Sequence, residues 1–418
     1  MYRGVINIDT VKKMFKSLPS SWKLVKLEEI LIEKLCNGLY KTEDFLGKGV
    51  LFLDINGLYK GLNADFSKAR RVQVTESEHK KYEIKKEDIL VNRVSKKAEG
   101  VGKAVLVGEM KETAVYESNM IRVRVDKKRV SPLFIVYYLS SDQSRQELLS
   151  KANVSNQASI NQEAVKSLKI PLPPIDEQRR IAAILDQADA IRRKRQQAIA
   201  LTDELLRSTF LEMFGDPVIN PKGWEVRKLS ELCSKITDGT HKTPTYLSSG
   251  IPFISAKNIK SGKINWENTK FISFEEHQAL TSRCRPEIND VLLTKSGSIG
   301  EASIVNTNID FSLFESVALL KLKKSEKSWI ESRFLATFLN QENVRLNYYR
   351  NIKGVGVKHL HLVEIKNIPV ILPPRKLQNL FIKILNQLEN SRLKSENTIT
   401  ESNNLFNSLL QRAFKGQL

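Results

Sequence analysis

The stretch IPLPPIDEQRRIAAIL, residues 170–185, decides how this chain is built. Its two adjacent prolines cannot continue a helix from before them, and the residue that precedes a proline is held in extended backbone. Asp176 then stands as a candidate N-cap, and no glycine or proline follows until Gly215. The pattern predicts one helix over residues 176–213, which is about 57 Å long at the standard helical rise.

Apolar side chains recur in this predicted helix at spacings of three and four residues, as in a helix that buries one face. Arg192 and Arg195 interrupt the apolar seam. A helix this long with an interrupted seam needs a partner to be stable. The apolar or small positions are Ile181, Leu185, Ala188, Ile199, Leu206 and Met213.

The same organisation recurs 200 residues later. Leu172-Pro173-Pro174 returns as Leu372-Pro373-Pro374, and Gln178 returns as Gln378. Self-similarity at a fixed period indicates a repeated structural unit. The chain therefore reads as a tandem duplication of a mixed domain, a proline-rich hinge and a long helix.

The second long helix is predicted over residues 375–418, with a stop at Gly416. Its middle, residues 391–404, is strongly polar and would be marginal alone. An antiparallel, coiled-coil-like pair with the first helix is the economical arrangement, and it relates the two domains by a pseudo-two-fold axis. The alternative is that each helix belongs to an ordinary bundle. The apolar positions are Leu377, Phe381, Ile384, Leu388, Ile399, Phe406, Leu409 and Phe414.

The remaining blocks, residues 1–175 and 214–374, read as two mixed domains, so the fold class is α+β. Runs with β-branched character predict strands in both blocks, and each block has a helix after its last clear strand. The expected strands are 49–53, 88–91, 101–107 and 120–125, then 251–254, 290–293, 302–305 and 317–322; the expected helices are 132–149 and 329–348.

The composition excludes several classes of protein. The 418 residues are 41% hydrophobic and 27% charged, so the chain can bury real cores and is not a disordered tail. No apolar run is long enough for a membrane span, and the N-terminus does not look like a signal peptide. The widely spaced Cys36, Cys233 and Cys284 suit a reducing cytoplasm and form no CxxC pair.

The net charge of +20 suggests a polyanionic partner, nucleic acid before membrane. Residues 1–175 hold 31 Lys and Arg against 21 Asp and Glu, and residues 214–374 hold 22 against 16. Residues 176–213 hold seven of each, and residues 375–418 hold seven against three. Most of the excess therefore lies in the two domains, as expected of two DNA-facing domains joined by a solvated spacer.

Polar and basic loops in both domains are the candidate DNA contacts, because Arg, Lys, Asn and Gln read base edges and glycine-rich backbone approaches phosphate closely. For any single one of these residues a solvated loop or turn remains the alternative. The candidates are Asn92, Arg93, Lys96, Lys97, Asn156 and Gln157 in the first domain, and Thr240, His241, Lys242, Thr243, Lys295, Ser296, Ser298, Arg350, Lys353 and Lys358 in the second.

Motifs for catalysis are absent from the sequence. Neither Pro-Pro pair is preceded by Asn or Asp or followed by an aromatic residue, as an adenine methyltransferase site would require. No GxxxxGK[ST] motif occurs, and the five histidines have no HExxH spacing. We therefore expect a non-catalytic chain with no cofactor and no metal of its own.

The chain contains twice a proline hinge, a glutamine four residues after its last proline, and a long helix. These features resemble the conserved regions of specificity subunits of type I restriction–modification systems. The resemblance covers nearly the whole chain. It lies in residues 170–185, 205–215, 372–385 and 406–416 for the conserved regions, and in residues 238–244, 250–254 and 290–300 for a common target-recognition-domain variant.

This resemblance implies that each domain reads one half of a bipartite, asymmetric site on double-stranded DNA. The helices would set the unread spacer and dock two methyltransferase subunits, to which two motor–nuclease subunits join. S-adenosylmethionine, ATP and Mg²⁺ would belong to those partners. The first domain lacks a loop like Asp238-Gly239-Thr240-His241, so the two half-sites should differ.

Two other functions stay open at this point. A structural scaffold would use its basic domains to bind protein, and its binding to DNA would depend little on salt. A self-sufficient nuclease would need carboxylates clustered around a metal, and scattered Asp and Glu cannot exclude this.

Overall fold

The computed structural model describes residues 18–154, 156–260, 262–323, 329–351 and 359–418. The chain divides into two compact units, of which the first is assembled from two segments far apart in sequence. The first unit comprises Met1–Gln196 with Asn397–Leu418, and the second comprises Gln197–Glu396. Each unit therefore holds one mixed domain together with part of both long helices.

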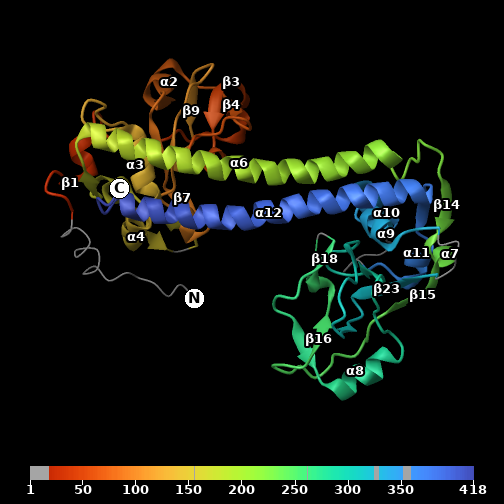
Figure 1. Ribbon diagram of the computed structural model, residues 1–418. Coiled ribbons are helices and arrows are strands. Elements are labelled where there is room, and N and C mark those ends of the chain that lie inside the picture. The colour runs from red at the N-terminus through yellow and green to blue at the C-terminus, as the bar shows by residue number, and fades with distance from the viewer. Residues whose placement is uncertain (1–17, 155, 261, 324–328, 352–358) are drawn as a thin grey trace. The chain divides into compact units, whose positions relative to one another are not determined.

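Two long helices, α6 (Ile175–Phe214) and α12 (Arg375–Ala413), occupy the predicted positions (Figure 1). The expectation that Asp176 is the N-cap was wrong, because α6 already begins at Ile175. Asp176 lies instead in the first turn, where a negative charge suits the helix dipole. Gly215 follows the last helical residue with a φ of 78°, a left-handed conformation that glycine adopts without strain.

The first unit contains two four-stranded sheets, with strand orders β2-β10-β6-β8 and β4-β3-β9-β5. A small sheet β11-β12-β7 and the pair β1-β13 complete it. Its strands are β1 (Lys23–Lys26), β2 (Cys36–Asn37), β3 (Leu46–Leu53), β4 (Arg70–Val72), β5 (Glu83–Ile84), β6 (Ile89–Asn92), β7 (Val94–Ser95), β8 (Ala104–Leu106), β9 (Ala114–Tyr116), β10 (Met120–Val123), β11 (Asn153–Val154), β12 (Ala158–Ser159) and β13 (Lys169–Leu172); its shorter helices are α2 (Glu76–Tyr82), α3 (Pro132–Ser140), α4 (Asp142–Ser150) and α5 (Gln162–Lys166).

The second unit repeats this plan with a four-stranded sheet β15-β23-β20-β21, the pair β14-β24 and a sheet β19-β16-β22 that is paired as β4-β3-β9 is, and it also has the pair β17-β18. Its strands are β14 (Glu225–Lys228), β15 (Cys233–Asp238), β16 (Ile251–Ile254), β17 (Ile259–Lys260), β18 (Lys263–Ile264), β19 (Lys270–Ile272), β20 (Val291–Thr294), β21 (Ala302–Ile304), β22 (Ser312–Leu313), β23 (Val317–Leu322) and β24 (Pro369–Leu372); its shorter helices are α7 (Leu229–Leu232), α8 (Phe274–Thr281), α9 (Ser332–Leu339), α10 (Glu342–Asn351) and α11 (Leu362–Lys366).

The predicted strands are present in both units, with two kinds of difference. The strand expected over residues 101–107 starts only at Ala104, because a left-handed turn at Gly102 precedes it. The helices expected over residues 132–149 and 329–348 are each two helices. In the first unit the break is at Ser141, whose hydroxyl accepts a hydrogen bond from the Ser144 N–H and so caps α4.

The proline-rich segment before each long helix was expected to be a hinge, and this was wrong. Residues 169–172 form β13, which pairs antiparallel with β1 over four residues. Residues 369–372 form β24, which pairs with β14 in the same way. Each segment is therefore held against its domain by a β-ladder, and the long helix that follows begins at a defined position on the domain.

A fully buried glutamine adds the second fastening in each unit. The Gln178 side chain accepts a hydrogen bond from the Ser131 N–H (2.9 Å) and donates to the carbonyls of Arg129 (3.1 Å) and Pro173 (2.8 Å). The glutamine of the Pro-Pro-x-x-x-Gln motif thus joins the start of α6 to the segment that leads into α3.

Gln378 makes the same three contacts in the second unit. Its side chain accepts from the Glu331 N–H (2.9 Å) and donates to the carbonyls of Trp329 (2.9 Å) and Pro373 (2.8 Å). The identical geometry confirms that the sequence repeat is a structural repeat.

Aromatic side chains tie the long helices to each domain. In the second unit, Phe210 and Phe214 at the end of α6 pack against Phe381 of α12 and Phe334 of α9, with ring centroids 4.9–5.9 Å apart. All four side chains are buried. The expected seam of α6 had Leu206 and Met213 but missed these two phenylalanines, which carry the packing.

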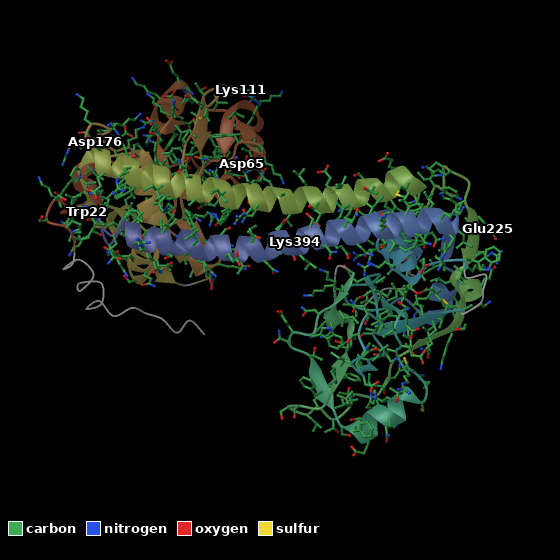
Figure 2. All side chains as sticks on the ribbon, in the orientation of Figure 1. Trp22, Asp65, Lys111, Asp176, Glu225 and Lys394 are labelled. Atoms are coloured by element: carbon green, nitrogen blue, oxygen red, sulfur yellow. The ribbon has the colours of Figure 1, made fainter. Side chains whose placement is uncertain are left out.

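In the first unit, Phe414, the residue directly after α12, packs on Phe134 (5.3 Å) and Tyr138 (5.1 Å) of α3. The same apolar cluster contains Ile181 and Leu185 from the start of α6. Figure 1 shows α3 and α4 beside these helix ends, and Figure 2 shows the labelled Trp22 and Asp176 close to them. In each unit the start of one long helix therefore lies against the end of the other, so the two run antiparallel.

Polar contacts replace apolar ones where arginines interrupt the seam. In the first unit Arg192 lies over the Phe406 ring at 4.6 Å, and Arg195 donates to the Thr398 carbonyl (3.1 Å) and the Ser402 hydroxyl. In the second unit Arg392 pairs with Asp203 at 2.7 Å. The interruption is thus a set of specific contacts between α6 and α12.

Replacing the buried glutamine should weaken the first unit. Gln178→Ala leaves the Ser131 N–H and two carbonyls without their partner, and each unsatisfied buried group costs about 1–3 kcal/mol. We expect the free energy of unfolding of the first unit to fall by about 2–4 kcal/mol, measured by urea unfolding followed by circular dichroism. Gln196→Ala, at an exposed position of the same helix, is the control and should change little. Equal stability of the two variants would contradict the fastening role.

Candidate functional site

The structure brings together the two stretches of the first domain that the sequence singled out. β7 pairs antiparallel with β12, so that Ser95 lies opposite Ala158 and Val94 opposite Ser159. β12 in turn pairs with β11. The loop after β7 and the turn before β12 therefore leave the small sheet at the same end of its strands.

The side chains at this end of the small sheet differ in exposure. Lys96 and Lys97 are exposed after β7, and Asn156 and Gln157 are exposed before β12. Arg93 is partly buried, and its guanidinium donates to the Ser118 carbonyl at 3.3 Å. Two cations and two amides are thus free to face a ligand.

Asn92 is the member of this group for which the DNA-contact expectation was wrong. Its side chain is fully buried, donates to the Tyr59 hydroxyl (3.0 Å) and the Gly100 carbonyl (2.8 Å), and accepts from the Val94 N–H (3.1 Å). A side chain with all these bonds satisfied inside the protein cannot read a base edge. Asn92 instead shapes the loop that carries Lys96 and Lys97.

In the second unit a buried carboxylate joins the two predicted loops. Asp238, with 5% of its side chain exposed, pairs with Lys295 from the loop after β20 and with Arg283 at 3.1 Å. It also lies 3.4 Å from His241 Nε2, and His241 Nδ1 is 2.7 Å from Glu315. The ion pair with Lys295 is largely buried, with 11% of the lysine side chain exposed. Lys295 therefore holds the two loops together, whereas His241, 58% exposed, faces outward.

The remaining side chains of these loops lie at the surface. Lys242, Thr243 and Ser298 are exposed, and Thr240 and Ser296 are partly buried. The Thr240 hydroxyl accepts from the Lys242 N–H at 3.1 Å, which folds the loop into a tight turn. A hollow of about 340 Å³ lies beside this turn and is lined in part by its residues 239–242.

Three candidates cannot be placed. Arg350 lies in α10, but its side chain is not among those described. Lys353 and Lys358 lie outside the described residues. Nearby, the Leu360 N–H donates to the Lys295 carbonyl at 2.8 Å, as the Ile160 N–H does to the Arg93 carbonyl at 2.9 Å. The backbone at Leu360 thus lies against the loop that begins at Lys295, as the backbone at Ile160 lies against the loop that begins at Arg93.

The first domain has a backbone counterpart of the Asp238–His241 loop, which the sequence did not reveal. The Leu39 N–H donates to the Tyr116 carbonyl (2.8 Å), as the Thr240 N–H donates to the Leu313 carbonyl (3.0 Å). Tyr40 therefore stands where His241 stands in the second domain, and it is 76% exposed. The sequence signal was an aromatic residue two positions after a glycine, as His241 is two positions after Gly239.

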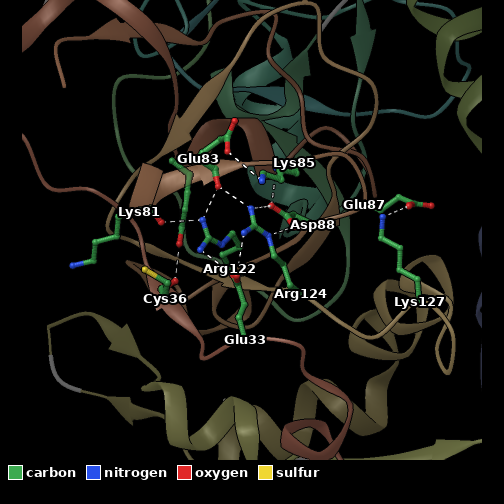
Figure 3. Close-up of polar contacts among 11 residues, drawn as sticks. Glu33, Cys36, Lys81, Glu83, Lys85, Glu87, Asp88, Arg122, Arg124 and Lys127 are labelled. Carbon is green, nitrogen blue, oxygen red and sulfur yellow. Dashed lines mark hydrogen bonds and ion pairs between the residues drawn. The ribbon is translucent and has the colours of Figure 1, made fainter. Parts of the chain in front are cut away.

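Two arginines of the first unit are not available to a ligand, because they bind other groups inside the domain. Figure 3 shows Arg122 and Arg124 of the first unit in one buried network. Arg122 donates to Glu33 (2.9 Å) and to the Glu83 carbonyl (2.6 Å), and Arg124 donates twice to Asp88 (2.6 and 2.9 Å). Arg122 is 6% exposed. These cations stabilise the sheet and are not available to a polyanion.

Metal sites and reactive thiols can be assessed in the parts of the chain that the structure describes. Among those residues no group of three or more His, Cys, Asp or Glu could hold a metal ion. Burial raises the pKa of Cys233 to about 12 and that of Cys284 to about 11, so neither offers a thiolate near neutral pH. No described helix is long and apolar enough to cross a membrane.

Removing the carboxylate that joins the second domain's loops should be costly. Asp238→Ala leaves Lys295 as an uncompensated, largely buried cation, and breaking such a pair costs about 3 kcal/mol. We expect this loss in the free energy of unfolding of the second unit, measured by urea titration. His241→Ala removes an exposed member of the same cluster and should cost less than about 1 kcal/mol. Similar losses for both variants would show that the Asp238–Lys295 pair does not hold the loops.

Comparison with known families identifies both repeats. A model described as the type I restriction modification DNA specificity domain matches residues 19–201 and again residues 221–402. The chain is 24% identical over 397 residues to the putative type I restriction enzyme MjaX specificity subunit of Methanocaldococcus jannaschii, covering 89% of this chain and 88% of the relative. It is 23% identical to the EcoBI specificity subunit of Escherichia coli, covering 96% and 87%.

Solved structures share the fold. A chain from work on complex assembly and conformational transition of the type I restriction–modification system aligns with a TM-score of 0.56 at 18% identity, covering 96% of this chain and 99% of that one. The type I restriction–modification S subunit from M. genitalium aligns with a TM-score of 0.55 at 16% identity, covering 95% and 98%. Because the family model matches most of the chain in two consecutive copies, this protein belongs to the specificity subunits of type I restriction–modification systems.

Proposed function

We propose that this chain is the DNA-reading subunit of a type I restriction–modification complex, and that each domain reads one half of a bipartite, asymmetric site. The observation that carries this is the pair of structurally equivalent loop clusters, one per repeat, that expose Lys, Asn, Gln, Thr and His side chains. Such side chains donate to and accept from base edges and phosphates.

The two half-sites should differ because equivalent positions carry different chemistry. Tyr40 offers an aromatic face and one hydroxyl, whereas His241 at the same position offers two ring nitrogens. The loop after β6 is four residues longer than the loop after β20 and contains Lys96 and Lys97. The first domain therefore presents more charge, and the second presents more hydroxyls.

The long helices form, in this proposal, an antiparallel coiled-coil-like spacer. α6 has 40 residues and α12 has 39. A helix of this length measures about 60 Å. The ladders and buried glutamines at their starts would transmit that length to the domains and so set the unread DNA spacer.

The complex would be completed by partners that supply the chemistry. Two methyltransferase subunits would dock on the helices and bring S-adenosylmethionine. Two motor–nuclease subunits would bind ATP and Mg²⁺ and carry out ATP-dependent cleavage of the DNA. This chain would be the non-catalytic subunit. The second long helix begins with Arg375-Lys376-Leu377 where the first begins with Ile175-Asp176-Glu177, so the two docking surfaces would not be identical.

Binding to duplex DNA should depend steeply on salt. A protein that contacts about six phosphates has a slope of about −5 in a plot of log affinity against log salt concentration. We expect at least this slope for the chain assembled with its methyltransferase subunits, measured by fluorescence anisotropy on a duplex that contains the methylated site. The chain alone with S-adenosylmethionine should methylate nothing. A flat slope would favour the protein-binding scaffold, and methylation by the chain alone would overturn the non-catalytic role.

Lengthening both helices should lengthen the tolerated spacer. Contacts of Arg195 with Thr398 and of Asp203 with Arg392 place residue 199 level with the region near 396. Seven residues inserted at both places add about 10.5 Å of helix, which is about three base pairs of DNA. Methylome sequencing of cells with the variant should show the same half-sites with the longer spacer. Insertion into α6 alone is the control and should abolish methylation, and an unchanged spacer in the double insertion would refute the ruler.

A further inference from the structure

Position 103 in the first unit and position 301 in the second are structurally equivalent. The Asn92 N–H donates to the Lys103 carbonyl at 2.8 Å, and the Thr294 N–H donates to the Glu301 carbonyl at 2.9 Å. Both residues directly precede the last strand of the four-stranded sheet, β8 or β21. The two repeats thus place opposite charges at the same point of the fold.

An arginine lies beside this position in both units. Arg145 is the fourth residue of α4, and Arg345 is the fourth residue of α10. A Cβ atom added at the glycine before position 103 would meet Arg145 at 3.2 Å, and one added before position 301 would meet Arg345 at 3.3 Å. The arginines therefore approach the same turn from the same helix position.

In the second unit the charge of this arginine is neutralised by an ion pair. Arg345 NH1 lies 2.9 Å from Glu301 Oε1, and the two side chains are 29% and 18% exposed. The carboxylate neutralises the guanidinium inside the protein.

In the first unit the arrangement has two positive charges instead. Arg145 donates to the backbone carbonyls of Val101 and Glu99, and the Lys103 ammonium lies over the Tyr59 ring at 4.6 Å. The negative charge of Glu99 acts on the Arg145 guanidinium and offsets part of the cost of burying it. Burial and the nearby Arg145 guanidinium lower the pKa of Lys103, and burial lowers the pKa of Arg145. The burial of two neighbouring cations thus has a cost that Glu99 offsets only in part, and a bound anion would relieve the rest.

The surroundings point to the kind of anion. Arg145 donates hydrogen bonds to two backbone carbonyls of the loop that carries Lys96 and Lys97. Both lysines are exposed and belong to the candidate DNA-binding site. Tyr59 is 46% exposed next to Lys103. A DNA phosphodiester suits an Arg and a Lys together, because guanidinium and ammonium donors can share its two non-bridging oxygens.

We propose that Lys103 and Arg145 form a phosphate-binding site in the first domain, and that its ligand is a backbone phosphate of the DNA half-site read by that domain. The assignment rests on the DNA-reading function proposed above. The second domain has no such site at the equivalent position, because Glu301 occupies the place of the anion.

Lys103→Glu tests the site because it copies the ion pair that the second repeat already accommodates. The variant should therefore fold, with a melting temperature at least equal to that of the wild type. In the complex with methyltransferase subunits it should bind the duplex about tenfold more weakly, and the salt slope should become shallower by about 1–2, one or two phosphate contacts. Lys111→Glu makes the same charge change at an exposed position of the same domain (Figure 2) and should alter neither quantity beyond the effect of net charge.

Three outcomes decide the matter. If the wild-type complex does not bind duplex DNA, the proposed function fails, whereas if it binds and Lys103→Glu behaves as Lys111→Glu does, only the phosphate site fails. Inorganic phosphate separates the two sources of the anion. If it raises the melting temperature of the wild type but not of Lys103→Glu, while both bind the duplex equally, the site takes free phosphate and the DNA assignment is overturned.

Discussion

A buried glutamine at the start of each long helix is the constraint on which the rest of the structure depends. A polar side chain enclosed by protein must have its hydrogen bonds satisfied, and Gln178 and Gln378 achieve this only when helix start, proline segment and domain are in one arrangement. Together with the four-residue ladders of β13 and β24, they convert a chain that could bend at its prolines into one whose helices leave each domain in a set direction.

Duplication explains why the two units can share a framework and differ in chemistry. The backbone hydrogen bonds at Leu39 and Thr240, and at Asn92 and Thr294, repeat almost unchanged. The side chains that these turns present do not repeat, because an exposed residue is constrained by its ligand and not by packing. A framework of this kind lets each domain change what it contacts without changing how it attaches to the helices.

The sequence predicted the repeat, both long helices and most strands, because proline pairs, glycine stops and apolar periodicity are local signals. It missed Phe210 and Phe214, since the seam chosen by spacing alone omitted the residues that face the domain. It also placed Asn92 at the surface, because polarity does not distinguish a side chain that shapes a loop from one that reads a ligand. Lys103 and Arg145 lie 42 residues apart, and only the fold brings them together.

The arginines inside the helix pair have a consequence for alignment. Arg195 donates to the Thr398 carbonyl and to the Ser402 hydroxyl of α12, so sliding one helix past the other by a turn would break both contacts. Polar contacts of this kind weaken a helix pair but discriminate strongly against shifted registers. These contacts therefore fix one register between α6 and α12. Any separation that the helix pair sets would then have one value and not a range of nearby values.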